Sequence, residues 1–313
     1  MTPREPVVER NSSETSGQED LLQALEAARA EIVALKAENE DLLLLYSTTT
    51  EHGEAVEDQL AEANVLLQQT QTRLNQEIAE AASYILSILP EPRAKDPATD
   101  WLLIPSTELG GDSFGHHAID MDHEAFYLLD VCGHGVGAAL LSVTAINVLR
   151  SAALANTDFR DPAAVLSALN DAFPMEKQNN MYFTIWYAVY QRSSGALVYS
   201  SAGHPPSILL RGSAGQPAEA FRLETGGVAL GTFPGVKYRS DSFKVEPGDR
   251  LMLLSDGTFE VEKADGEMLA FSEFVDFLAA PGGDDPKAVL AWIKSLNGAG
   301  SLPDDFSLLR VVF

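Results

Sequence analysis

The stretch DVCGHGVGAAL at residues 130–140 decides the fold of this chain. The apolar run at residues 125–129 precedes it and has the length and aromatic content of a buried strand. Asp130 therefore closes a strand, Gly133 and Gly135 allow a tight turn, and the alanine- and leucine-rich residues after them begin a helix. A strand that ends in an acidic residue, followed by a glycine turn and a helix, is typical of a site that binds either a metal ion or a phosphate group.

Four further fragments place an acidic residue or a histidine beside glycine, proline or the end of an apolar run. They are GGDSFG at 110–115, AGHPP at 202–206, LLSDGTFE at 253–260 and PDDFSLL at 303–309. Carboxylate oxygens are the ligands that Mg²⁺ and Mn²⁺ prefer, and Asp112, Asp130, Asp256 and Asp304 supply four. The sequence contains neither a lysine-bearing phosphate loop nor a dinucleotide fingerprint. The fragments therefore favour a divalent metal site.

The order of these motifs resembles a known family. GGD, DVxGHGxxAAL, SALNDAF with Asn170, YFTIWYAVY, AGHPP, PGDRLMLLSDG and DDFSLL follow one another between about residues 88 and 313. This order resembles the bacterial stress-response and sporulation branch of the metal-dependent protein phosphatases, relatives of protein phosphatase 2C. The resemblance implies an α+β fold in which two antiparallel β-sheets are sandwiched between helices. It also implies removal of phosphate from serine or threonine of a partner protein, usually an anti-sigma-factor antagonist in a partner-switching pathway.

The resemblance assigns a role to each candidate ligand of two Mn²⁺ or Mg²⁺ ions. Asp130 would bridge the two ions, and the backbone carbonyl of Val131 would bind one of them. Asp112 would serve that same ion, directly or through water, while Asp256 and Asp304 would hold the other. A water between the ions would attack the phosphorus in line, without a phosphoenzyme.

His134 is the candidate general acid for the leaving serine or threonine oxygen, because imidazole exchanges protons near neutral pH. The chain departs from the family after GGD, where many relatives have two aromatic residues and a second aspartate, whereas this chain has Ser113, Phe114 and Gly115. The four carboxylates remain, so we expect an active enzyme. The alternative is a pseudophosphatase that acts as a dimeric scaffold and binds the antagonist without turnover.

Other histidines and one asparagine are weaker candidates. His116 and His117 are adjacent, which does not suit one tetrahedral zinc site, so we expect them and His123 to lie in a solvated loop. His204 either lines the site or braces a turn through a hydrogen bond. Asn170 is expected to brace its helix rather than to touch the substrate.

Composition limits the partners of the chain. The 21 Lys and Arg residues against 46 Asp and Glu give a formal charge of −25, which repels nucleic acid and anionic membranes. The sequence has no apolar run long enough to span a bilayer, and residues 1–20 lack the apolar core of a signal peptide. We therefore expect a soluble, cytoplasmic protein. Its single cysteine, Cys132, is expected to pack as a small hydrophobic residue.

The chain divides into three segments. The polar residues 1–18 are expected to be disordered. Residues 19–89 contain no proline and one glycine, Gly53, and their leucines follow a heptad, which predicts a helix that forms a parallel coiled-coil homodimer. Beyond Gly53 the heptad is displaced by four residues, which predicts local unwinding. This coiled coil either binds an upstream regulator or serves only to dimerise, and residues 90–313 form the catalytic domain.

Periodicity within the catalytic domain predicts short strands alternating with helices. The predicted strands are 101–104, 126–130, 183–190, 196–200, 207–210, 250–254 and 307–312. The predicted helices are 138–155, 162–172, 271–279 and 286–296. Several strands are joined by short turns, which favours antiparallel pairing.

Overall fold

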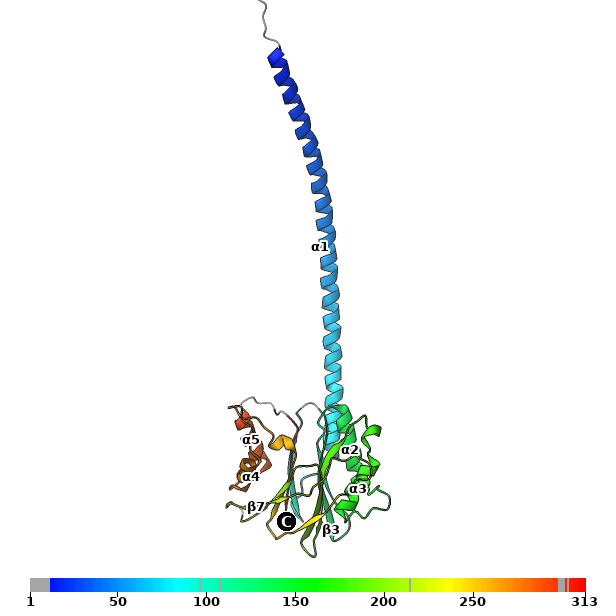
Figure 1. Cartoon of the computed structure of the whole chain (residues 1–313), viewed down its shortest axis with the longest axis vertical. Coiled ribbons are helices and arrows are strands. Elements are labelled where there is room, and N and C mark those ends of the chain that lie inside the picture. Colours follow the sequence, from blue (N-terminus) through cyan, green and yellow to red (C-terminus); the bar gives the residue numbers. More distant parts are fainter. Residues whose placement is uncertain (1–11, 96, 107–108, 214, 298–301, 303) are drawn as a thin grey trace, which may run out of the picture. The chain divides into compact units, whose positions relative to one another are not determined.

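The computed structural model describes residues 12–95, 97–106, 109–213, 215–297, 302 and 304–313, with the side chains of residues 12–16 left out. It divides into two compact units, Met1–Asn75 and Gln76–Phe313. The described part of the first unit is helical throughout, and the second is a layered α+β structure (Figure 1). The predicted fold class is therefore confirmed.

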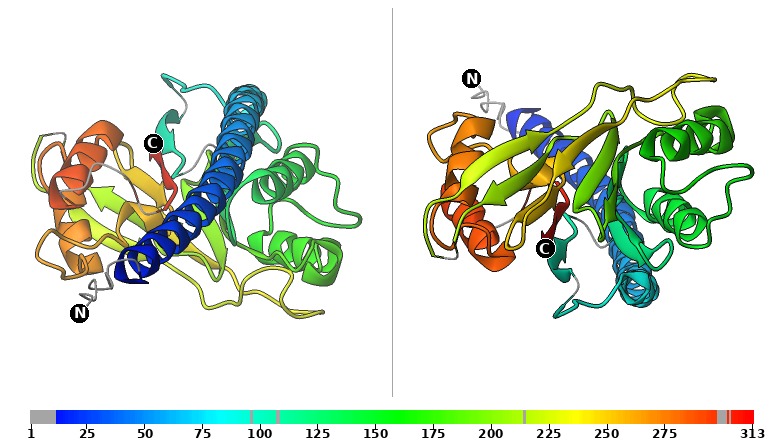
Figure 2. Two further views of the ribbon diagram at one scale, coloured as in Figure 1. Left: turned by 90° about the horizontal axis from the view of Figure 1, so that it is seen from above. Right: turned by 90° about the horizontal axis from the view of Figure 1, so that it is seen from below.

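Two five-stranded sheets face each other in Gln76–Phe313 (Figure 2). The strands are β1 (Ala98–Ile104), β2 (Ser113–Ala118), β3 (His123–Val131), β4 (Phe183–Gln191), β5 (Ala196–Ala202), β6 (Ser207–Arg211), β7 (Glu219–Leu223), β8 (Asp241–Lys244), β9 (Arg250–Leu254) and β10 (Phe306–Val312). One sheet has the order β1-β10-β9-β6-β7 and the other the order β2-β3-β4-β5-β8. Neighbouring strands are antiparallel in both sheets, and short connections join three of the pairs, β2-β3, β4-β5 and β6-β7.

Helices cover the outer face of each sheet (Figure 2). They are α2 (Val136–Arg150) and α3 (Pro162–Ala172) on the β3 sheet, and α4 (Phe271–Ala279) and α5 (Pro286–Asn297) on the β9 sheet; two short 3₁₀ helices, η1 (Met175–Lys177) and η2 (Asp256–Thr258), complete the fold. Three apolar clusters result, one between the sheets and one under each helical layer. β3 is buried along most of its length because both of its faces are covered.

Helix α1 extends over Ser12–Ile88, so the long N-terminal helix is present as predicted. It begins earlier than expected, because residues 12–18 are helical rather than disordered, while the disorder predicted for residues 1–11 lies outside the described residues. Among the described helices, none combines the length and apolar composition that crossing a bilayer requires.

The last turn of α1 packs within the Gln76–Phe313 unit. Leu89 joins the apolar cluster between the sheets, and Ile85 lines a narrow crevice together with Leu103 and Asp112. The Ile88 carbonyl accepts a hydrogen bond from Arg150 Nη1 at 2.9 Å. The end of the helix therefore belongs to the same packed structure as the sheets.

Candidate functional site

The apolar core between the sheets becomes polar at one end. Side chains alternate between the two faces of a strand, and on β3 Phe126 and Leu128 point between the sheets. Asp130 continues this row by one step. Its carboxylate therefore emerges between the sheets, where β3 ends.

Five other rows of side chains between the sheets also end in a polar residue. The polar residues that continue inter-sheet rows are Asp112 before Phe114, Thr184 before Trp186, Ser207 before Leu209, Ser255 after Leu253, and Ser307 before Leu309. A pocket of about 500 Å³ opens at this end, and its walls include Asp130, Thr184, Asp256 and Asp304. The strand alternation therefore collects oxygen-bearing side chains at this end of the inter-sheet core, and Asp130 and Thr184 reach the pocket itself.

The loop after β3 forms a second wall of this pocket. Val131 and His134 line it together with Asp130. Gly133 and Gly135 have φ angles of 86° and 90°, a conformation that glycine adopts without strain. Gly135 N–H donates to the Leu109 carbonyl at 2.9 Å, and α2 begins at the next residue. The motif therefore forms the expected strand, turn and helix.

Gly111 lies directly against the Val131 carbonyl. A Cβ atom at Gly111 would be 2.5 Å from that oxygen. Real Cβ atoms essentially never come so close to an oxygen, so only glycine fits here without a backbone shift. This contact places the GGD fragment beside the end of β3.

Asp305 holds the GGD fragment in position. Its carboxylate accepts hydrogen bonds from Gly111 N–H at 2.7 Å and from Ser106 N–H at 2.8 Å. Gly110 packs so closely on this carboxylate that a Cβ atom there would overlap it. Asp305 is buried and is absent from the pocket wall, so it acts on the site through the backbone of Ser106 and Gly111.

The acidic side chains of the pocket raise each other's pKa values. Burial, together with Asp256 and Asp304, raises the pKa of Asp130 to about 7. Burial and Asp304 raise the pKa of Asp256 to about 6. Burial and Asp130 raise the pKa of Asp112 well above its usual value, although the nearby Ser307 and Ser255 hydroxyls offset part of this effect. No Lys or Arg belongs to the described wall of the pocket, so bound cations would relieve the repulsion.

The donor set fits hard divalent cations. Asp112 Oδ2 is buried and has no hydrogen-bond partner in the described part of the chain, which leaves a lone pair available to a cation. As the side chains lie, no three acidic, imidazole or thiol groups among the described residues converge on one point. Mg²⁺ and Mn²⁺ do not need such convergence, because they typically bind one or two carboxylates and retain several waters. The carboxylates and the Val131 carbonyl are therefore suitable ligands.

Gly115 stands where many relatives are expected to have a second aspartate. A Cβ atom at this position would be 2.5 Å from the Tyr127 hydroxyl oxygen. The Tyr127 ring occupies this space and stacks on Tyr187 at a centroid distance of 5.9 Å. A tyrosine from the neighbouring strand thus replaces the missing side chain and excludes an aspartate.

His204 and Asn170 lie away from the pocket wall, whereas Cys132 belongs to it. His204 is buried, its Nδ1 lies 3.1 Å from the Pro205 carbonyl oxygen, and burial lowers its pKa to about 4. Asn170 bonds to a neighbouring loop rather than to its own helix, because it accepts from Gly231 N–H at 3.0 Å and donates to the Phe233 carbonyl at 2.8 Å. Cys132 lines the pocket, partly buried, and its sulfur accepts a hydrogen bond from Tyr182 N–H at 3.2 Å.

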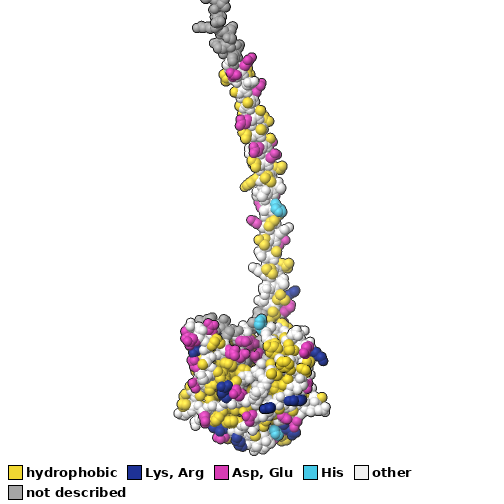
Figure 3. All heavy atoms as spheres, viewed as in Figure 1, with side chains coloured by type: hydrophobic (Ala, Val, Ile, Leu, Met, Phe, Trp, Pro, Cys, Tyr) yellow, Lys and Arg dark blue, Asp and Glu magenta, His cyan; other side chains and the backbone are white. Residues whose placement is uncertain are grey.

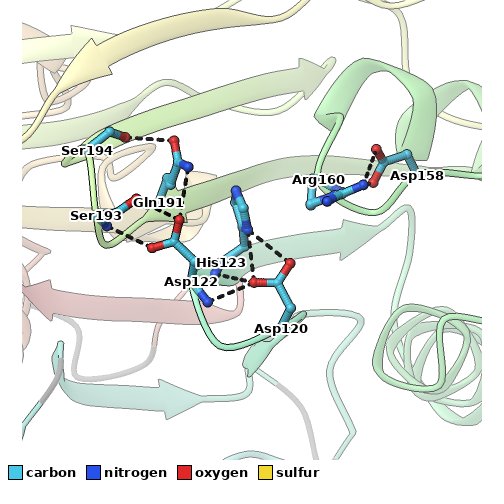
Figure 4. Close-up of polar contacts among 8 residues, drawn as sticks. All are labelled: Asp120, Asp122, His123, Asp158, Arg160, Gln191, Ser193 and Ser194. Carbon is cyan, nitrogen blue, oxygen red and sulfur yellow. Dashed lines mark hydrogen bonds and ion pairs between the residues drawn. The ribbon is translucent and has the colours of Figure 1, made fainter.

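The other three histidines lie on β2 and β3. The predicted solvated loop is wrong for His116 and His117, which lie within β2. Their ring nitrogens contact Thr99 Oγ1 at 3.2 Å and the Tyr127 hydroxyl at 3.3 Å respectively. Figure 4 shows His123 against Asp120 in the turn between β2 and β3, with Nδ1 and Oδ1 separated by 2.9 Å. This turn lies at the opposite end of β3 from Asp130.

Comparisons with known proteins agree with this geometry. Residues 120–313 match the family described as Stage II sporulation protein E (SpoIIE). The chain is 27% identical over 198 residues to the phosphoserine phosphatase RsbU of Bacillus subtilis, covering 63% of this chain and 57% of that protein. It is 26% identical over 198 residues to the phosphoserine phosphatase RsbP of the same organism, covering 62% of this chain and 47% of that protein. The chain thus spans about half the length of the curated relatives it matches.

Solved structures share the fold. The PP2C domain of SiaA from Pseudomonas aeruginosa has a TM-score of 0.65 at 23% identity, covering 78% of this chain and 98% of that one. The PP2C phosphatase domain of SpoIIE from Bacillus subtilis, with a fragment of its regulatory domain, has a TM-score of 0.60 at 16% identity, covering 71% and 64%. The RsbU and RsbW domains of Rv1364c from Mycobacterium tuberculosis give 0.56 at 24% identity, covering 72% and 61%. This chain therefore belongs to the SpoIIE family and has the PP2C phosphatase fold.

Proposed function

We propose that this chain is a metal-dependent protein serine/threonine phosphatase that hydrolyses a phosphoserine or phosphothreonine of a partner protein. The observation that carries the proposal is the group of carboxylates at one opening between the sheets, with raised pKa values and no basic side chain among the described residues of the wall. Such a site repels a phosphate dianion unless cations bind first. The family supports the same activity, since two curated relatives are named phosphoserine phosphatases.

The proposed mechanism assigns metal binding to this chain's oxygen atoms. Asp112, Asp130, Asp256, Asp304 and the Val131 carbonyl would hold two Mn²⁺ or Mg²⁺ ions. Such ions would neutralise the phosphoryl oxygens and make the attacking water more acidic. Asp305 keeps the Asp112 loop in place through backbone hydrogen bonds.

His134 is the proposed general acid. His134 lines the pocket, which supports this role. An imidazole in this place would hold a proton and give it to the serine or threonine oxygen as the P–O bond breaks. Helix α2 begins two residues later, and the hydrogen bond from Gly135 N–H to the Leu109 carbonyl holds the backbone beside His134.

The substrate in this proposal is an anti-sigma-factor antagonist in a partner-switching pathway in the cytoplasm. RsbU and RsbW domains occur together in the similar chain Rv1364c, which supports a signalling pathway of this kind. Helix α1 would pair with a second copy through its exposed leucine row and so form a homodimer, and an upstream regulator could bind this coiled coil.

The test is phosphate release from a phosphoserine-containing antagonist protein in Mn²⁺. Wild-type protein should release phosphate, and His134→Ala should lower kcat by roughly 10²–10⁴-fold, the usual contribution of a general acid. The variant should retain Mn²⁺ binding by calorimetry. Antagonist binding without phosphate release by the wild type would instead indicate a pseudophosphatase scaffold.

A further inference from the structure

Helix α2 exposes a surface without charged side chains. Residues 131–149 contain no Asp, Glu, Lys or Arg, and Arg150 in the last turn is the first charged residue of α2. Val136 and Leu140 are 53% and 58% exposed and lie one turn apart on the same side of the helix. Exposed helices usually carry charges on their solvent face. In a chain of net charge −25, an uncharged and apolar face therefore indicates an interface.

This surface is continuous with the wall of the catalytic pocket. Met181 packs against the first turn of α2, since a Cβ atom at Gly137 would be 3.6 Å from the Met181 sulfur. The next residue, Tyr182, is 38% exposed and lines the pocket. We call Val136, Leu140, Met181 and Tyr182 the apolar rim. Figure 3 shows hydrophobic side chains gathered beside an acidic group on one face of this unit.

The pocket mouth therefore has two chemically different sides. Asp256 and Asp304 lie next to β9 and β10 of one sheet, whereas Tyr182, at the start of the apolar rim, lies next to β4 of the other sheet. The phosphoryl group belongs with the acidic side, where bound cations would hold it. The substrate residues that flank the phosphorylated serine then have to lie over the mouth of the pocket, where the apolar rim begins. An acidic flank would meet a strongly negative protein, whereas an apolar flank would bury the exposed rim.

We propose that the apolar rim binds residues adjacent to the phosphoserine of a protein substrate, and that these residues are apolar rather than acidic. This inference rests on the proposed phosphatase function and adds a substrate preference to it. Leu140 is the most exposed residue of the rim and is absent from the pocket wall, so it can be changed without altering the candidate metal ligands.

The experiment compares three probes with the full chain in Mn²⁺. They are p-nitrophenyl phosphate, a phosphoserine peptide flanked by leucine and valine, and a peptide of equal length flanked by aspartate. Wild-type kcat/KM should be about tenfold higher for the apolar peptide than for the acidic one. Leu140→Glu should remove this preference and leave p-nitrophenyl phosphate hydrolysis within about twofold of wild type, because Leu140 lies outside the pocket wall and that probe has no flanking residues to reach it.

Met121→Glu is the matched control. Met121 is 98% exposed in the turn between β2 and β3, at the opposite end of β3 from Asp130. Placing the same charge there should change none of the three rates. An equal loss for all three probes in Leu140→Glu, or no peptide preference in the wild type, would overturn the inference.

Two further measurements separate the remaining explanations. Light scattering on wild type and Leu140→Glu tests whether the rim joins two copies of the chain, and dissociation without a change in peptide preference would overturn the inference. Fluorescence anisotropy measures binding of the labelled apolar peptide. Binding that depends on Leu140, without hydrolysis of any probe, would contradict the phosphatase function and still support the rim as a binding surface.

Discussion

Gly111 joins two backbone segments that the site has to keep together. We expect Gly111→Ala to force the GGD loop away from the Val131 carbonyl, since the new Cβ would be 2.5 Å from that oxygen. Overpacking of this kind costs about 1–3 kcal/mol, and the displaced loop should also weaken Mn²⁺ binding. Thermal unfolding and Mn²⁺ titration calorimetry check both effects.

Gly137→Ala is the matched control for that change. A Cβ atom at Gly137 meets only the flexible Met181 side chain, at an ordinary contact distance of 3.6 Å. Alanine is also favoured over glycine within a helix by up to about 1 kcal/mol. The control should therefore be at least as stable as wild type, and equal destabilisation by both variants would refute the proposed role of Gly111.

The raised pKa values of Asp130 and Asp256 predict that the stability of the metal-free protein depends on pH. Their pKa values of about 7 and about 6 lie above the usual carboxyl value of 3.8, so the folded state holds protons that the unfolded state releases. Their contribution to stability is fully present below about pH 4 and is lost as pH rises through 6 and 7. In EDTA, Asp130→Asn should therefore raise Tm relative to wild type more at pH 8 than at pH 5.

Mn²⁺ should reverse this dependence, because it binds the deprotonated carboxylates. The Tm increase on adding Mn²⁺ to wild type should be larger at pH 8 than at pH 5, and it should be small for Asp130→Asn. Burial lowers the pKa of His204 to about 4, so this residue destabilises the folded protein as pH falls. Wild type and Asp130→Asn both contain His204, so the Tm difference between them cancels this opposite effect. A Tm difference between wild type and Asp130→Asn that is the same at both pH values would contradict the electrostatic description.

At the scale of single strands and helices, sequence periodicity predicts the interior better than the edges. The predicted ranges at 126–130 and 250–254 correspond to β3 and β9, which lie inside their sheets and are largely buried. β2, β7 and β8 escape prediction, and each is the last strand of its sheet. Edge strands are short and carry polar residues, which weakens the apolar pattern on which such predictions depend.

The candidate site, like the fold, is only partly predictable from local sequence motifs. Short motifs beside glycine or proline, together with the family resemblance, single out Asp130, Val131, His134, Asp256 and Asp304, and the fold brings these five residues to one pocket. Asp112 lies behind this wall, beside Asp305 in the crevice that Ile85 also lines. Thr184, Ser255 and Ser307 escape prediction, because an isolated hydroxyl in a strand carries no local signal. Their place becomes evident only when each is recognised as the polar end of an apolar row.

At the scale of the whole molecule, α1 has a row of exposed apolar side chains along its length, and its last turn packs within the Gln76–Phe313 unit. Leu25, Ile32, Leu42, Leu60 and Leu67 are exposed along the helix of a single chain. We expect full-length protein at micromolar concentration to be a dimer, because a long helix with an exposed heptad row gains stability by pairing. Removal of residues 1–75 should give a monomer that stays folded, and light scattering with thermal unfolding checks both. A monomeric full-length protein would refute the coiled coil.

Removal of residues 1–88 is the informative comparison for that truncation. This deletion also removes Ile85 and Ala82, which line the crevice beside Asp112 and Asp305. The Arg150 guanidinium would lose its bond to the Ile88 carbonyl as well. We expect this protein to unfold at a lower temperature than the protein that begins at residue 76. Equal Tm values would mean that the end of α1 contributes nothing to the catalytic unit.

The central claim is that carboxylates at the end of the sandwich hold cations that make this chain a phosphatase. The most direct measurement is the rate of p-nitrophenyl phosphate hydrolysis by wild type and Asp130→Asn, each in excess Mn²⁺ and in excess EDTA. We predict hydrolysis by wild type in Mn²⁺, and at least about a hundredfold less in EDTA or with Asp130→Asn, since the variant would lose a proposed metal ligand while keeping the shape of the side chain. Undiminished hydrolysis by wild type in EDTA, or by Asp130→Asn in Mn²⁺, would contradict the claim.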